Sequence, residues 1–173
     1  MKSHQDIMGS PESATLPEAL AEEAIFKLET YLEWIDHAVS MLDEETVWSR
    51  PSQNLNSVGN LLMHLEGNVR QWMLHGIGGQ EDHRQRDSEF STGGGIPKAD
   101  LLKQLHETVD AAKVVIRVPR SESDWLQRRE IQGFSTTTLG AVIHIFEHFS
   151  YHTGQIVQLA KSVTGRDMGF YTL

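Results

Sequence analysis

Hydrophobic residues recur at alternating steps of three and four along most of this chain, a pattern typical of amphipathic helices. The first series follows Thr15-Leu-Pro17-Glu18, which has the spacing of a capping box and carries proline in the first turn. Its apolar positions are Ile25, Leu28, Leu32, Ile35, Val39 and Leu42. A repeat of about 3.5 residues predicts a helix over 16–43 that packs in a bundle.

Three more series of this kind follow, and they predict helices over 57–75, 97–117 and 136–164. Asn56-Ser57 offers a cap for the second helix, and Pro97 stands at the start of the third. The fourth lies between the polar run 135–138 and Gly165. Four amphipathic helices of this length predict an all-α fold, a four-helix bundle.

The connections between these helices carry further information. The glycine-rich link over 76–97 is long enough to cross the end of a bundle, so the second and third helices can run parallel. No segment has the pattern of a confident strand, although 129–134 can be extended. Residues 1–14 lack periodicity and are expected to form a disordered tail, with a single domain over 15–173.

Composition excludes several classes of function. The net charge is -9 over 173 residues, which disfavours nucleic-acid binding and attraction to anionic membranes. No apolar run approaches the roughly 20 residues that span a bilayer, and no signal peptide is evident, so we expect a cytoplasmic protein. Cysteine is absent. Any transition-metal site must therefore use histidine, carboxylate or water.

The last predicted helix carries the candidate chemistry. His144, His148 and His152 follow one another at steps of four, so they lie near one stripe of the helix. On the helical wheel His152 falls inside the apolar arc, His148 at its edge and His144 outside it. His144 and His152 are about 12 Å apart along the axis, too far to share one ion. The pattern favours His148 with His152 as a ligand pair; hydrogen-bonded histidines at the core boundary are the alternative.

Three motifs, in order along the chain, resemble the DinB-like superfamily of small metal-binding bundles. They are Asn56-Ser-Val-Gly-Asn-Leu-Leu-Met-His64-Leu-Glu-Gly-Asn68, Arg86-Asp-Ser-Glu-Phe90 and His148-Phe-Ser-Tyr-His-Thr-Gly-Gln-Ile156. The middle motif resembles the branch labelled DUF1572. The resemblance covers roughly residues 18–164 and implies an up-down-down-up topology and a homodimer.

The resemblance also implies a divalent metal ion, zinc or nickel, held by three histidines. Carried over by position, the ligands are His64, His148 and His152. On the wheel alone His64 is a histidine at the flank of its helix, beside Asn68. His144 has no ligand counterpart and is expected beside the site or in its cleft.

An open site with three histidines is the arrangement of catalytic metal centres. Because the superfamily includes thiol-dependent S-transferases, the resemblance implies a metal-dependent transferase or a hydrolase acting on a small-molecule substrate. A non-catalytic, stress-associated metal-binding module is the alternative. No general base is identifiable, since Glu66 and Glu147 point away from the neighbouring histidines on the wheel.

Several polar residues are candidates for the surroundings of the metal. Gln155 is expected to orient His148, because ligating imidazoles usually hydrogen-bond through their other nitrogen. The Tyr151 hydroxyl and the Asn68 amide are candidates for polar groups in the cleft. Arg84 and Arg86 either bind an anionic group of the substrate or belong to an internal knot of salt bridges.

Overall fold

The computed structural model describes residues 15–170. The tail predicted over residues 1–14 lies outside this range. Four long helical segments make up most of the fold: α1 (Leu16–Ser40), α3 (Val58–Val69) continued by the π-helix η2 (Arg70–His75), α5 (Lys98–Arg117) and α7 (Thr138–Thr164). The predicted all-α class is confirmed, because these segments correspond to the four predicted helices and strand content is small.

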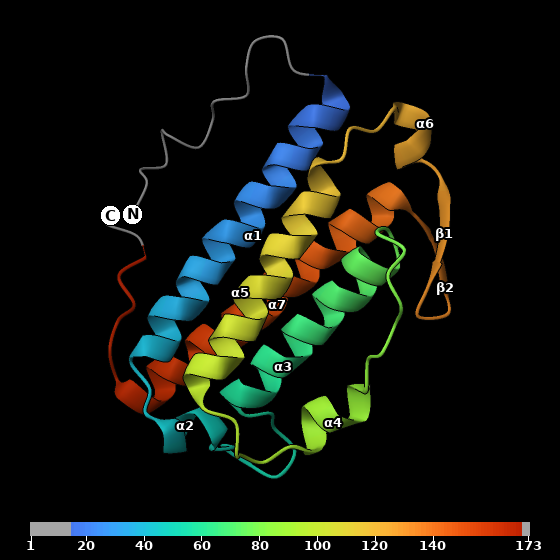
Figure 1. The fold of residues 1–173 in the computed structure, drawn as a ribbon. Coiled ribbons are helices and arrows are strands. Elements are labelled where there is room, and N and C mark those ends of the chain that lie inside the picture. The colour runs from blue at the N-terminus through green and yellow to red at the C-terminus, as the bar shows by residue number, and fades with distance from the viewer. Residues whose placement is uncertain (1–14, 171–173) are drawn as a thin grey trace.

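The four segments pack around one apolar core. Helix α1 contacts α7 and α5, and α3 contacts the same two helices from the other side. In Figure 1, α1 and α7 run in one direction and α3 and α5 in the opposite one. The core takes the predicted apolar faces: Ile25, Leu28, Ile35, Val39, Leu61, Leu65, Leu105, Val109, Ile145 and Phe149 are at most 2% exposed.

The predicted helix starts are correct to within two residues. Thr15 caps α1 in a capping box with Glu18, and Ser57 caps α3 in a second box with Asn60. The end of α1 differs, because the helix ends at Ser40 rather than at Asp43. Asp43 instead accepts a hydrogen bond from the backbone N–H of Thr46 and starts a new helix.

Three short helices lie within segments that were predicted as connections. They are α2 (Glu44–Trp48), α4 (Arg86–Ser91) and α6 (Glu122–Trp125). Each has only four to six residues, too few to show a helical period in the sequence. In Figure 1, α4 lies beside the first half of α3, where the long link after η2 brings it.

A small hairpin lies where the sequence showed no confident strand but allowed an extended segment over 129–134. Strands β1 (Arg128–Ile131) and β2 (Phe134–Thr137) pair antiparallel, with Ile131 opposite Phe134. Gln132 and Gly133 form the two-residue turn with φ of 55° and 78°, the geometry that matches the twist of a hairpin. The polar run before the last helix is therefore largely strand, and α7 begins at Thr138.

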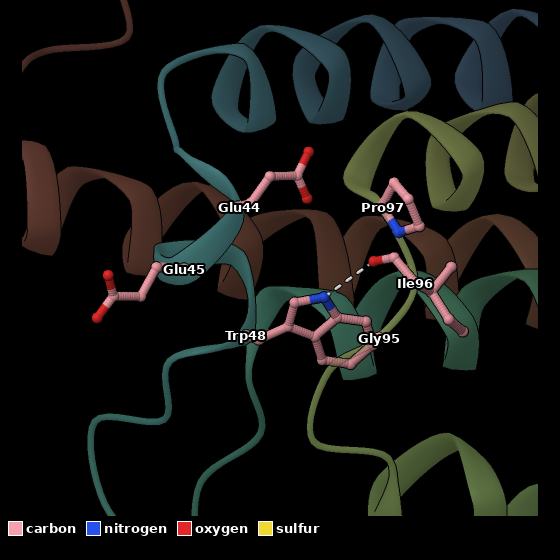
Figure 2. A pocket seen from close by; sticks show the side chains of 6 residues that line it. All are labelled: Glu44, Glu45, Trp48, Gly95, Ile96 and Pro97. Carbon is pink, nitrogen blue, oxygen red and sulfur yellow. Dashed lines mark hydrogen bonds between the residues drawn. The ribbon is translucent and has the colours of Figure 1, made fainter.

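The surface has an open hollow of about 510 Å³ between α2 and the start of α5. Figure 2 shows Trp48 on its wall, with the indole Nε1 donating to the Ile96 carbonyl at 3.0 Å. Among residues 15–170, no histidine lines this hollow. Within residues 15–170, no helix is long and apolar enough to cross a membrane.

Candidate metal site

Helix α7 holds two histidines one turn apart on its inward side. His152 is 8% exposed and His148 is half-buried, as the helical wheel predicts. The helix is well defined at both ends: the Thr137 side chain accepts from the N–H of Gly140, and Gly165 ends the helix with φ of 65°. The centroids of the two imidazole rings lie 4.4 Å apart.

Helix α3 brings His64 to the same point. Its ring centroid is 5.0 Å from that of His148 and 4.8 Å from that of His152. The Nε2 atoms of His64 and His148 are 2.9 Å apart. One ring nitrogen from each of the three histidines falls within 4.8 Å of the others, so the three could hold one ion. The structure thus brings together the three residues carried over from the resemblance.

The outer nitrogens of two rings are occupied by hydrogen-bond acceptors. His64 Nδ1 lies 2.8 Å from Glu89 Oε2, and His152 Nδ1 lies 2.7 Å from Gln155 Oε1. A carboxylate or amide oxygen accepts, so both Nδ1 atoms carry the proton and both Nε2 atoms keep a free lone pair. Gln155 therefore orients His152, not His148 as predicted, because the side chains at i and i+3 meet on the helix.

The donor set meets the requirements of a divalent transition metal. With metal–nitrogen bonds of about 2.1 Å, neighbouring imidazole nitrogens stand about 3.0–3.4 Å apart. The closest pair here is at 2.9 Å and the widest within 4.8 Å, so small ring movements are sufficient. His64 and His152 each keep a lone pair on Nε2, and lone pairs on nitrogens that lie this close together fit a shared cation.

Glu89 is itself held by a buried arginine. Arg84 donates from Nε to Oε1 at 2.6 Å and from Nη2 to Oε2 at 2.9 Å, and Nη1 donates to Gln71 at 2.9 Å. Arg84 Nη2 also lies 3.2 Å from His64 Nδ1, but that nitrogen donates to the carboxylate and has no lone pair left for the guanidinium. The guanidinium of Arg84 is therefore occupied within the protein, which matches the salt-bridge interpretation rather than anion binding.

Arg86 differs from Arg84. It is exposed, and its guanidinium lies over the Phe90 ring at 5.2 Å from the ring centroid. The Phe90 ring itself lies next to the site, with its centroid 4.8 Å from the centroid of the His64 ring. Binding of an anion by Arg86 stays a prediction.

The other predicted neighbours of the metal lie around the histidines. The His144 ring stacks on Trp72 at 3.9 Å and on His148 at 5.3 Å, and its Nε2 is 3.5 Å from the Asn68 amide nitrogen. His144 and Asn68 therefore stand beside the three histidines and not among them. Tyr151 is 63% exposed, and its hydroxyl accepts from Gln155 Nε2 at 3.3 Å.

Glu66 and Glu147 lie away from the three histidines, as expected. Glu147 is exposed, whereas Glu66 is partly buried and pairs with Arg70 and Thr108. Within residues 15–170, neither carboxylate forms a hydrogen bond with His64 or His148. The general base stays unidentified.

Burial favours the neutral form of His148, His152 and His144. Desolvation, followed by the proximity of His152 and His64, lowers the pKa of His148 to about 3. Desolvation also lowers the pKa of His152 and that of His144. Burial alone would raise the pKa of Glu89, but the hydrogen bonds and charge of Arg84 and the contact with His64 outweigh it, so the pKa is lowered. Neutral imidazoles are the form that binds a metal.

Sequence reasoning missed three contributors to this site: Glu89, Trp72 and Phe90. Glu89 and Phe90 stand in the middle motif of the resemblance, but no local spacing connects them with His64. Trp72 lies in the second predicted helix, where no pattern links it to His144. The π-helix in which it lies follows α3 directly, and such helices occur often at functional sites.

Comparison with known proteins agrees with this architecture. The family model described as "Protein of unknown function (DUF1572)" matches residues 17–173. The crystal structure of a DinB-like protein from Bacillus cereus ATCC 10987 superposes with a TM-score of 0.68 at 12% sequence identity. The match covers 90% of this chain and 97% of that one, and at this identity it shows a shared fold alone. The comparison with curated proteins found no match.

Proposed function

This chain belongs to the DUF1572 family and has a DinB-like fold, and from that premise we propose that it binds one divalent metal ion through Nε2 of His64, His148 and His152. The observation that carries the proposal is the convergence of three ring nitrogens within 4.8 Å. The hydrogen bonds of Glu89 and Gln155 support it, because they leave two lone pairs directed toward the common point. Imidazole ligands and the absence of cysteine favour zinc or nickel.

The finer arrangement of the bundle belongs to the same proposal. The opposite directions of the α1/α7 pair and the α3/α5 pair support the up-down-down-up topology that the sequence resemblance implies. A homodimer is also proposed from the resemblance. The outer face of α7 offers an apolar contact surface near the site. It carries Ile143, which is 39% exposed, and Tyr151, which is 63% exposed.

For its activity, we propose a metal-dependent transferase of the thiol S-transferase type or a hydrolase that acts on a small molecule. Three protein ligands leave coordination positions for water and substrate, and an ion held in this way acidifies a water or binds a thiolate. His144 and Asn68 flank the ligand His148 on one side, where they can hydrogen-bond a polar group of a substrate. Trp72 supports His144 from behind by stacking.

A non-catalytic metal-binding module is the second candidate, and a specific observation favours it. Within residues 15–170, Glu89 is the carboxylate that hydrogen-bonds to one of the three histidines, His64, and its charge is compensated by Arg84. It is therefore not a free general base. In this case the ion chiefly stabilises the contact between α3 and α7.

Metal analysis of the purified protein, followed by a thiol-conjugation screen and a hydrolysis screen, tests these proposals. One equivalent of zinc or nickel with turnover that is lost on chelation supports the enzyme. One equivalent of metal without turnover, together with destabilisation by a chelator, supports the module. Protein that cannot be loaded with any divalent ion refutes the metal site itself.

A further inference from the structure

Arg84 and Glu89 form a buried ion pair next to His64. The Arg84 side chain is 3% exposed and that of Glu89 is 6% exposed, and two hydrogen bonds join the groups. Burying two charges costs several kcal/mol per ion, and the attraction within the pair seldom returns more than this cost. A role in stability alone therefore gives a poor account of the pair.

The surrounding structure is built to bring Glu89 to this position. Asn60 Nδ2 donates to the Glu89 carbonyl at 2.9 Å and to the Thr92 carbonyl at 2.7 Å, which ties the C-terminal part of α4 to α3. Arg50 also donates to the Phe90 carbonyl. Gly67 leaves the space, because a Cβ there would lie 2.3 Å from Glu89 Oε1 and 3.0 Å from Arg84 Nε.

The two outer hydrogen bonds of the histidines are not equivalent. His64 donates to a carboxylate, whereas His152 donates to the neutral amide of Gln155. A carboxylate withdraws the Nδ1 proton more strongly, and so raises the electron density at Nε2 more than an amide does. Of these two histidines, His64 is therefore the stronger electron-pair donor to a metal ion. It is also the only one of the three proposed ligands that comes from α3.

We propose that Glu89 is a positioning residue for the metal ligand His64: it fixes the Nδ1–H tautomer and strengthens Nε2 as a donor, and Arg84 limits the charge that Glu89 supplies. The inference rests on the proposed metal site and adds residues that the ligand set does not contain. With Arg84 in place, the carboxylate is nearly neutralised, so the ion keeps most of its own charge. A metal centre of this kind polarises a substrate more than one with a free carboxylate behind its ligand.

The main test is a double variant, Arg84→Met with Glu89→Leu, which removes the acceptor and leaves no buried charge unpaired. Apolar replacement of a buried ion pair is often neutral for stability, so the metal-free variant should fold and melt close to the wild type. We expect its zinc affinity, measured by competition with a chromophoric chelator, to fall roughly 10- to 100-fold. The control is Glu29→Leu with Lys113→Met, on α1 and α5. It removes an ion pair whose Nζ and Oε1 atoms are 3.0 Å apart, together with the bridge from Lys113 to Asp110, and should leave zinc affinity unchanged.

The tautomer of His64 gives a readout that a merely structural role does not change. In metal-free wild type, the ring ¹⁵N shifts of His64 should report Nδ1–H, and in the double variant a mixture of both tautomers. Glu89→Gln should keep the tautomer, because an amide oxygen still accepts, yet weaken zinc binding. A folded double variant with wild-type affinity and wild-type tautomer would overturn the proposal.

Arg84→Gln separates the charge effect from structural damage. Without the guanidinium, Glu89 is less neutralised and interacts more strongly with a dication, so zinc affinity should equal or exceed that of wild type while the metal-free protein melts at a lower temperature. Weakening by the same factor as in Glu89→Gln would contradict the charge-limiting role of Arg84. If wild type binds no divalent ion, the proposed function fails, but the tautomer measured without metal still decides whether Glu89 orients His64.

Discussion

Glu89 accepts a hydrogen bond from Nδ1 of His64 at 2.8 Å, although 25 residues separate the two along the chain. The contact depends on a short helix that follows the long link after η2 and is fastened to α3 by Asn60. A segment that lacks an obvious period in the sequence thus supplies a direct partner to a candidate metal ligand.

Replacing His148 or His152 with alanine should abolish stoichiometric metal binding, because each removes one of three converging nitrogens and leaves two. His144→Ala should weaken binding at most, since His144 stacks beside His148 without pointing its nitrogen into the cluster. Metal content per chain, measured on protein loaded with zinc and passed over a desalting column, distinguishes the two results. Loss of stoichiometry in His144→Ala with retention in His152→Ala would exclude the proposed ligand set.

Gly67→Ala should destabilise the protein by about 1–3 kcal/mol, the usual cost of forcing an added methyl group into a packed position. The new Cβ would lie 2.3 Å from Glu89 Oε1, so the Arg84–Glu89 pair must shift away from His64. Urea unfolding of the metal-free protein gives the difference. The control is Gly154→Ala in α7, where no atom lies within 4 Å of the added Cβ and helix propensity predicts a gain of about 1 kcal/mol.

The metal-free protein should lose stability as the pH falls below about 6.5. The unfolded chain takes up protons on histidine near the ordinary pKa of 6.5, whereas burial lowers the pKa of His148 to about 3 in the folded state. Since the unfolded state binds more protons in this window, each such histidine lowers the free energy of unfolding by at most about 1.4 kcal/mol per pH unit. His152 and His144 shift in the same direction.

Urea denaturation between pH 7.5 and 5 in the presence of a chelator measures this slope. His148→Gln should reduce it, because the substituted side chain does not titrate. His83→Gln is the control, because the His83 side chain is 78% exposed and lies away from the buried histidines. A slope that stays the same in His148→Gln would show that burial of this ring does not govern acid stability.

A homodimer should be seen in solution as a particle of twice the 19.5 kDa chain mass. Sedimentation velocity across the micromolar range tests this. If the outer face of α7 forms the contact, Tyr151→Glu should shift the distribution toward the monomer, because a charge is costly to bury in an apolar interface. Leu126→Glu is the control, because Leu126 is also 63% exposed but lies at the end of α6. A 19.5 kDa particle throughout the concentration range would count against the dimer.

Much of the helical fold is determined by local patterns in the sequence. The helices begin where Thr15, Ser57 and Thr137 cap them, since a cap depends on residues within one turn. The pairing of His148 with His152 is equally local, because a spacing of four residues places two side chains on one face of any α-helix. The resemblance added His64 to the pair, and the structure brings its ring to the same point.

The surroundings of the three histidines were decided only by the tertiary structure. No periodicity predicts that Glu89 meets His64, that Trp72 supports His144, or that Gln155 binds His152 rather than His148. These contacts depend on the path of a long link, on a π-helical turn and on rotamers chosen in the packed state. The short helix α2 and the hairpin are decided in the same way, because elements of four or five residues are stable only against a core that the rest of the chain has built.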